Sequence, residues 1–196
     1  HSDNELIDGA LSLFIDYIAS ENYQRGIVFG DIEYIDVSGN VTGSWTGKHL
    51  GDGHLSNRHL IENYIDKDGS RFRPLQFLID KKSFEENGPY LEDYFLEDWE
   101  FTIRYLCNAD FHRINAPIVR FRDRPNSLGH QPEVYADSMM DVIEKHEKSL
   151  SEKFGLKSEF IYSNTLCRII LIFIHKNKTS VALGKFRLYK KSTPKK

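Results

Sequence analysis

The residues Glu97-Asp98-Trp99-Glu100 place three carboxylates and a large aromatic ring within about one turn of chain. They open the segment 97–107, where Trp99, Ile103 and Leu106 recur at helical spacing and predict a helix with one buried side. A carboxylate at a helix start that faces a pocket could act as a general base toward an attacking hydroxyl. The helix dipole also favours carboxylates in a first turn, so N-terminal capping is a second explanation of the same cluster.

Hydrophobic spacing predicts the elements that would position this cluster. A strand is predicted at residues 26–35, followed by a turn at 36–40 and a return strand from Val41. The glycine-rich segment 43–57 is predicted to be a polar binding or lid loop. Asp3 or Asn4 is expected to cap an N-terminal helix, whose apolar face is formed by Leu6, Ala10, Leu13, Phe14, Tyr17 and Ile18.

Further along the chain, the pattern changes from mixed to helical. A strand is predicted at 76–79, a short helix at 82–87, and a strand at 111–121 whose Pro117 places it near a sheet edge or a bulge. Beyond Pro132, helices are predicted at 134–153, 159–176 and 179–191. The sequence therefore predicts an α/β fold, with a mixed sheet and flanking helices over residues 1–130 and a C-terminal helical appendage over 131–196.

Composition limits the classes of partner. Of the 196 residues, 40% are apolar and 28% charged, and the net charge of −3 gives no field that would attract nucleic acid. The longest strongly apolar run, 169–174, is too short to span a bilayer. Cys107 and Cys167 are expected to be small core residues in a reducing compartment, which favours a cytoplasmic protein. The basic tail 185–196 is expected to be a solvated end or a peripheral contact with a membrane surface.

Other patterns that could indicate chemistry are weaker. His49, His54 and His59 recur every five residues, a spacing that does not gather side chains on one helix face, so we expect incidental surface histidines. The segment 51–53 lacks the spacing and the preceding strand of a phosphate-binding loop. The acidic cluster is therefore the leading candidate for a functional site.

The neighbours of the acidic cluster form an ordered series. Upstream lie Val28-Phe29-Gly30-Asp31-Ile32-Glu33-Tyr34-Ile35-Asp36 and Ser38-Gly39-Asn40, and the stretch 77–90 ends in Gly88-Pro89-Tyr90. Arg104 follows Asp98 by six residues, and Phe121-Arg122-Asp123-Arg124-Pro125-Asn126-Ser127-Leu128 comes after the next predicted strand. This order, over roughly residues 1–130, resembles the second half of the catalytic domain of family 2 glycosyltransferases, which have the GT-A fold.

The resemblance implies an inverting transfer of a sugar from a nucleotide-sugar donor to a hydroxyl of a saccharide or lipid-linked acceptor, in the synthesis of surface polysaccharide or glycoconjugates. Carried onto this chain, Asp98 is the expected general base, and Glu97 is its neighbour in the acceptor pocket. Trp99 could offer its ring to a sugar or pack in the core. Arg104 is expected near the substrate, where it would pair with a carboxylate and orient the helix.

The resemblance also implies a divalent cation, Mg²⁺ or Mn²⁺, held on the donor pyrophosphate by an Asp-x-Asp motif at the end of a preceding donor-binding half. Asp3 matches the second aspartate of that motif, and His1 stands in place of the first. Arg122 and Arg124 are expected to contact substrate, and Arg124 could steady the leaving phosphate. Because most of the donor-binding half would precede His1, we expect this chain alone to be a poor enzyme.

Two other functional classes stay open. A non-catalytic structural or assembly module would bury and pack Glu97 and Asp98 without an open groove. A glycoside hydrolase would need a second acid roughly 5–10 Å from Asp98 across a cleft. The transferase interpretation instead predicts Asp98 at a helix start, facing a concavity beside the end of the strand near residues 29–33.

Overall fold

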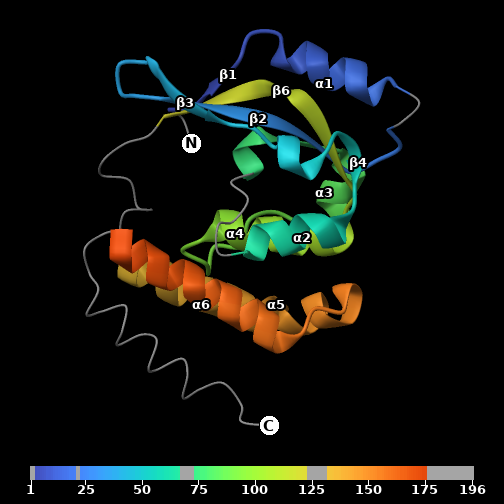
Figure 1. Cartoon of the computed structure of the whole chain (residues 1–196). Helices are drawn as coiled ribbons and strands as arrows, with labels where there is room; N and C mark the ends of the chain where they lie inside the picture. The colour runs from blue at the N-terminus through green and yellow to red at the C-terminus, as the bar shows by residue number, and fades with distance from the viewer. Residues whose placement is uncertain (1–2, 21–22, 67–72, 123–131, 176–196) are drawn as a thin grey trace.

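The computed structural model describes residues 3–20, 23–66, 73–122 and 132–175. Within these residues, a curled mixed sheet has one helix on its outer face and helices beneath its inner face (Figure 1). The strands pair in the order β1 (Glu5–Leu6), β6 (Phe111–Arg122), β2 (Ile27–Ile35) and β3 (Val41–Trp45), while β4 (Gly53–Leu55) pairs with β6 and β5 (Phe77–Ile79) with β2. Only β2 and β6 run parallel among these pairs. The predicted α/β class with helices after the sheet is confirmed.

The parallel pair β2–β6 forms the centre of the sheet. β2 is buried along most of its length because both of its faces are covered, as its nearly continuous apolar run predicts. Pro117 lies opposite Asp31, where the register shifts, so the predicted bulge is confirmed. On the side away from β2, β6 pairs with β4 at its start and with β1 near its end, which leaves Pro117 at a local edge, as also predicted. Pro117 falls between those two short partners, where its missing N–H costs no ladder bond.

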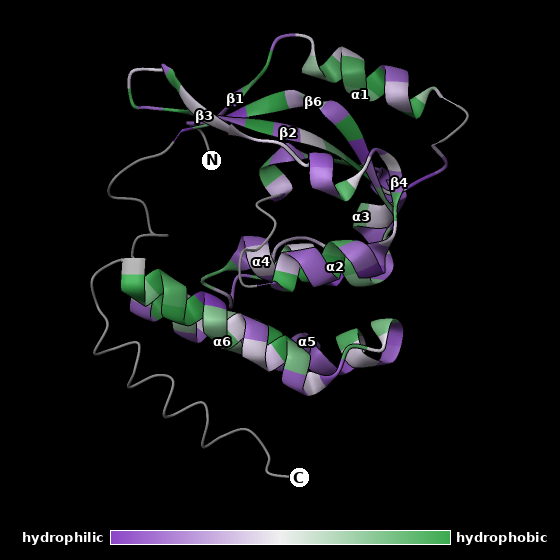
Figure 2. Cartoon of the chain, viewed as in Figure 1, coloured by the Kyte–Doolittle hydropathy of each residue, from purple (hydrophilic) through white to green (hydrophobic). Residues whose placement is uncertain are grey.

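The N-terminal helix begins later than predicted. α1 (Ala10–Ile18) starts after Gly9, whose φ of 81° ends the preceding extended segment, so Asp3 and Asn4 do not cap it. Leu6 instead lies in β1 and pairs with Val119 of β6. The helical face that packs on the sheet is narrower than expected, and several of the apolar side chains of α1, green in Figure 2, are exposed: Leu11, Leu13, Ile15 and Ile18.

Three helices lie beneath the inner face of the sheet: α2 (Asn57–Ile65), α3 (Lys81–Asn87) and α4 (Glu97–Asn108). The predicted helices at 82–87 and 97–107 are confirmed. Asp80 caps α3 by accepting a hydrogen bond from the backbone N–H of Ser83 at 2.9 Å. The segment 43–57 is not one long loop, because it contains β4 and the short 3₁₀ turn η1 (Lys48–Leu50), and α2 begins at its end. A second 3₁₀ turn, η2 (Pro74–Gln76), precedes β5.

Two long helices complete the described fold. α5 (Pro132–Phe154) and α6 (Ser158–His175) pack on one another and against α2 and α4, which confirms the helices predicted at 134–153 and 159–176. One hydrophobic cluster runs from β2 through α4 into these helices and includes Phe29, Leu106, Ile143, Ile161 and Phe173. The helix predicted at 179–191 and the basic tail lie outside the described residues.

The two cysteines differ in their exposure to solvent. Cys107 is buried as predicted, but Cys167 is exposed on α6, so its placement in the core was wrong. Its helix packs through other positions, including Thr165, Ile169 and Phe173. Among the described residues, no helix combines the length and apolarity needed to cross a bilayer.

Candidate active site

The acidic cluster lies in the first turn of α4, as predicted. Leu96 occupies the cap position and makes no side-chain cap hydrogen bond. Its carbonyl oxygen accepts hydrogen bonds from the backbone N–H groups of Trp99 (3.0 Å) and Glu100 (3.1 Å). The carboxylates of Glu97, Asp98 and Glu100 follow this cap, near the positive end of the helix dipole. None of the three carboxylates is therefore the side-chain cap of α4, although all three lie where the helix dipole favours negative charge.

The carboxyl group of Asp98 has a raised pKa. Burial is the main cause, the negative charge of Glu97 adds to it, and the nearby positive charge of Arg73 opposes it, so that the pKa rises to about 6. Two phenols, Tyr64 and Tyr90, are close enough to be influenced by the charge of Asp98. A carboxyl group with this pKa is mostly ionised at neutral pH and still basic enough to accept a proton in a transition state.

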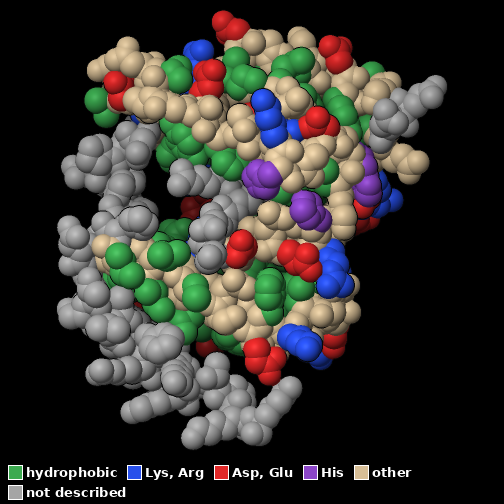
Figure 3. Space-filling view, in the orientation of Figure 1, with side chains coloured by type: hydrophobic (Ala, Val, Ile, Leu, Met, Phe, Trp, Pro, Cys, Tyr) green, Lys and Arg blue, Asp and Glu red, His purple; other side chains and the backbone are tan. Residues whose placement is uncertain are grey.

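Arg73 connects Asp98 to the carboxyl end of the sheet. Its guanidinium carbon lies 4.8 Å from the ring centre of Phe121, near the end of β6. Open α/β sheets bind ligands beyond the carboxyl ends of their parallel strands, and β2 and β6 end together here. Figure 3 shows a hollow between the sheet and the helices. Asp98 is half-buried, so its carboxyl group keeps some contact with solvent.

Arg104 fixes the loop that precedes the cluster. Its Nε donates to both carboxylate oxygens of Glu100 (3.1 and 3.2 Å), which confirms the predicted ion pair with a carboxylate. Its two terminal nitrogens reach the carbonyl oxygens of Asn87, Gly88 (3.2 Å) and Pro89 (2.8 Å). All three guanidinium nitrogens are thus engaged within the protein, where they hold the loop and the helix together, and a contact of Arg104 with substrate stays a prediction.

Glu100 joins α4 to α5. Its fully buried carboxylate also accepts a hydrogen bond from Nε2 of His146 at 3.0 Å and lies 3.5 Å from Nζ of Lys145. Burial alone would raise the pKa of Glu100, but the hydrogen bonds from His146 and Arg104 and the charges of Arg104 and Lys145 outweigh it and lower the pKa to about 2. Glu100 is therefore a permanent anion at neutral pH, and it holds the helix that carries Asp98.

Trp99 lies in the hydrophobic core. Its side chain is 4% exposed, its ring lies 6.1 Å from that of Tyr64, and the guanidinium of Arg168 lies 5.7 Å from its centre. Of the two roles considered for Trp99, this arrangement supports core packing. A sugar would have no open ring face to stack on here.

Arg122 lies at the end of β6 and organises the N-terminal strand. Its Nε donates to the carbonyl oxygen of Asp3 (3.1 Å), one terminal nitrogen donates to the carbonyl oxygen of Asp36 (2.8 Å), and the other pairs with Glu5. These bonds connect β1 to the hairpin after β2. These contacts use all three nitrogens of its guanidinium group, and the role of Arg122 in substrate binding stays a prediction.

The described residues do not form a divalent-metal site by themselves. No group of three or more His, Cys, Asp or Glu side chains within the described ranges has the geometry to hold a metal ion. Asp3 contributes one carboxylate, but His1 and Arg124, the other residues of the predicted donor site, lie outside the described residues. The metal role of Asp3 and the phosphate role of Arg124 therefore stay predictions.

A buried ion pair that the sequence did not predict holds the glycine-rich segment 43–57 against β2. Oδ1 of Asp31 accepts hydrogen bonds from Nη2 of Arg113 (2.7 Å) and from the backbone N–H of Gly47 (3.0 Å). Arg113 is wholly buried and also pairs with Asp52. The approach is so close that a Cβ on Gly47 would lie 2.5 Å from Nε of Arg113. In the sequence, Gly47 follows the predicted return strand, which is the only local hint of this contact. Arg113, the residue that Gly47 approaches, lies 66 residues further along the chain and could not be inferred from that position.

The histidines singled out by their spacing behave as expected. His49, His54 and His59 are exposed. His54 lies 3.7 Å from Asp110, and its ring lies 5.1 Å from that of the buried His112. Both ring nitrogens of His112 are engaged, by the hydroxyl of Tyr17 and the carbonyl oxygen of Arg25.

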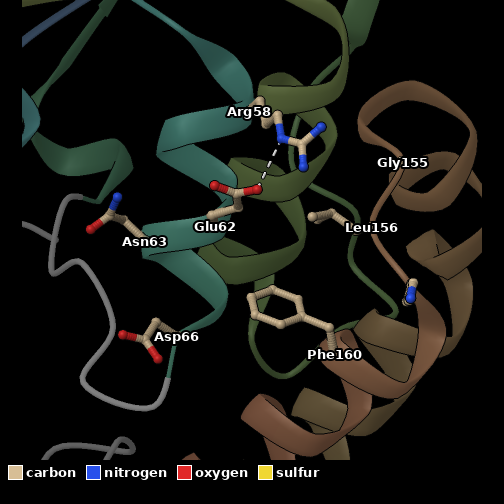
Figure 4. Close-up of a pocket in the computed structure, with 8 residues that line it drawn as sticks. Arg58, Glu62, Asn63, Asp66, Gly155, Leu156 and Phe160 are labelled. Carbon is tan, nitrogen blue, oxygen red and sulfur yellow. Dashed lines mark hydrogen bonds and ion pairs between the residues drawn. The ribbon is translucent and has the colours of Figure 1, made fainter.

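A second concave surface lies between α2 and the start of α6. This α2–α6 groove has a volume of ≈ 640 Å³ and is lined by Arg58, Glu62, Asn63, Asp66, Gly155, Leu156, Lys157 and Phe160. Figure 4 shows the ion pair between Arg58 and Glu62 (2.9 Å) on its wall. None of the predicted site residues lines it, so it is separate from the surroundings of Asp98.

Comparison of the chain with protein-family models and with curated protein sequences gives no match. The geometry around Asp98 and the ordered motifs are therefore the features that point to a function.

Proposed function

We propose that this chain is the acceptor-side part of an inverting glycosyltransferase that uses a nucleotide-sugar donor and acts on a saccharide or lipid-linked acceptor. The observation that carries the proposal is Asp98: a partly desolvated carboxyl group with a pKa of about 6 at the start of α4, influenced by the charge of Arg73, whose guanidinium lies over Phe121 near the end of β6. Such a group suits proton removal near neutral pH.

The proposed step is a single displacement at the anomeric carbon. Asp98 accepts the proton of the acceptor hydroxyl as the oxygen of that hydroxyl attacks the anomeric carbon of the donor. A new glycosidic C–O bond forms on one face of the sugar while the bond from the anomeric carbon to the nucleoside diphosphate breaks on the other, which inverts the configuration. Glu97 supports the step by raising the pKa of Asp98, since two adjacent negative charges disfavour each other.

The rigid surroundings of Asp98 support this assignment. Arg104 fixes the loop from Asn87 to Pro89, and Glu100 fixes α4 against α5 through His146. A base held in this way keeps its distance to a bound hydroxyl, and good positioning supplies a large share of the rate in bimolecular transfers. We further propose a role in polysaccharide or glycoconjugate synthesis at the cytoplasmic side, with the donor and its cation bound mostly outside the described residues and Asp3 as the cation ligand that this chain supplies.

The test is a transfer assay on the full-length product of the gene that encodes this chain, with a panel of radiolabelled nucleotide-sugars. Asp98→Asn preserves the size of the side chain and removes its basicity, and we expect it to lower kcat about 100- to 10,000-fold. The matched control is Glu152→Gln, the analogous carboxylate-to-amide change at an exposed position of α5 that pairs with Lys148 across a helical turn. Nucleotide-sugar-dependent transfer that survives Asp98→Asn would refute the proposal and favour a non-catalytic module.

A further inference from the structure

The aromatic side chain best placed to receive a sugar is Tyr90 rather than Trp99. Tyr90 is 43% exposed and stacks on the buried ring of Phe101, with ring centres 4.4 Å apart and planes at 27°. Phe101 stacks in turn on buried Tyr105 at 4.1 Å and 18°. Tyr90 is therefore the outer ring of a three-ring stack, and it presents apolar surface to solvent that the core does not cover.

The loop that carries Tyr90 is held in place before any ligand binds. The preceding residues Gly88 and Pro89 give their carbonyl oxygens to Arg104, and the hydroxyl of Tyr105 donates to the carbonyl oxygen of Gly88 at 2.9 Å. Gly88 has a φ of 78°, which lets the chain leave α3 sharply and turn toward α4. The ring thus needs little ordering on binding, which lowers the entropic cost of recognition.

Tyr90 also lies near the first turn of α4, because Phe101, on which its ring stacks, follows Asp98 by three residues on that helix. Burial of its hydroxyl and the negative charges of Asp98 and Glu97 raise the pKa of Tyr90. The phenol therefore keeps its proton at neutral pH and can donate it in a hydrogen bond. An apolar ring face, a phenolic donor and a carboxylate lie together at the start of α4.

This combination matches the chemistry of a pyranose ring. One face of such a ring carries C–H groups that pack on an aromatic surface, while its hydroxyls project from the edge toward hydrogen-bonding groups. Resting on the proposed transferase function, we propose that Tyr90 is the platform on which the acceptor sugar stacks, with its reacting hydroxyl directed toward Asp98. The buried Trp99 stiffens α4 beneath this subsite.

The binding test uses this chain and three simple probes: the methyl β-glycosides of glucose, galactose and N-acetylglucosamine, each titrated to about 50 mM, which covers millimolar affinities. Binding is followed by saturation-transfer NMR and by the ring resonances of Tyr90. We expect at least one glycoside to shift those resonances. Tyr90→Ala should weaken its binding roughly three- to tenfold, and Tyr90→Phe, which keeps the stacking face, should weaken it less than about threefold.

The control variant is Phe84→Ala, which removes an aromatic ring of the same 43% exposure on α3, outside the three-ring stack. It should leave glycoside binding unchanged, and the circular dichroism of all three variants should match that of the wild type. If no glycoside binds, or if Tyr90→Ala and Phe84→Ala weaken binding equally, the platform is refuted.

Kinetics on the full-length protein separate this inference from the proposed function. We expect Tyr90→Ala to raise the acceptor KM with little change in kcat, because stacking stabilises ground and transition states alike, whereas Asp98→Asn lowers kcat. Loss of transfer in Asp98→Asn with an unchanged acceptor KM in Tyr90→Ala would sink the platform and leave the transferase standing. Glycoside binding that depends on Tyr90, with transfer unaffected by Asp98→Asn, would refute the proposed base and leave Tyr90 as a sugar-binding residue.

Discussion

Replacing Asp98 with Asn should make the fold more stable at neutral pH, although the same change removes the proposed base. A carboxyl group whose pKa is raised in the folded protein binds its proton more tightly there than in the unfolded chain. Folding therefore becomes less favourable as pH rises from the ordinary value of 3.8 through about 6, and above that range the full penalty is present. Asparagine is uncharged in both states and carries no such penalty.

The magnitude follows from the pKa difference. A rise from 3.8 to about 6 is roughly two units, and at about 1.4 kcal/mol per unit this sets an upper bound of about 3 kcal/mol. Asp98 is partly exposed, so solvent screening reduces the effect, and we expect Asp98→Asn to stabilise the protein by about 1–2 kcal/mol above neutral pH. A carboxylate that only served the helix dipole would give the opposite sign, a loss of about 0.3–1 kcal/mol.

The assay is urea denaturation of the wild type and of Asp98→Asn at about pH 4 and about pH 8, where the protonation of Asp98 differs most. The quantity compared is the difference in unfolding free energy between the two proteins, because other titrating groups such as His112 cancel in it. We expect the difference to be near zero at the lower pH and to favour the variant at the higher. A variant that is less stable at the higher pH would refute the desolvated-base reasoning.

Two further substitutions test the supports of the site. Glu100→Ala should cost about 3–5 kcal/mol in thermal or chemical denaturation because it leaves Arg104 and His146 buried without their anion. Glu85→Ala, which breaks an exposed pair with Lys81, should cost less than about 1 kcal/mol, and equal losses would contradict the assigned role of Glu100. Gly47→Ala should cost about 1–3 kcal/mol by urea denaturation, since its Cβ would meet Nε of the buried Arg113 at 2.5 Å. Gly43→Ala, whose Cβ would meet nothing within 4 Å, is the matched control, and the packing argument fails if both glycine variants behave alike.

The sequence predicts best those elements whose signal is local. β2 and α4 were predicted with nearly their observed bounds, because a buried apolar run and a helical repeat each carry their own pattern. β1 and β4 were not, since strands of two or three residues depend on pairing with β6 rather than on any pattern of their own. α2 was missed although Ser56, its cap, precedes an apolar repeat, because the glycines before it suggested a continuous loop.

Some features of the candidate site were likewise predictable from the sequence, and others were not. The position of Asp98 at a helix start followed from the sequence, and so did the pairing of Arg104 with a carboxylate. The raised pKa of Asp98 did not, because its main cause is burial, which depends on how the folded chain packs around α4. Trp99 and Tyr90 could not be ranked as sugar platforms from residue type alone, since both are aromatic and only burial distinguishes them.

The pH dependence of kcat/KM for transfer by the full-length protein, compared with its Glu97→Gln variant, tests the central claim most directly. If ionised Asp98 removes the acceptor proton, kcat/KM rises with pH along an acid limb whose midpoint lies near the pKa of about 6. Because the charge of Glu97 helps to raise that pKa, Glu97→Gln should move the midpoint to lower pH. A profile that is flat across this range, or a midpoint unmoved by Glu97→Gln, would contradict the assignment of Asp98 as the base.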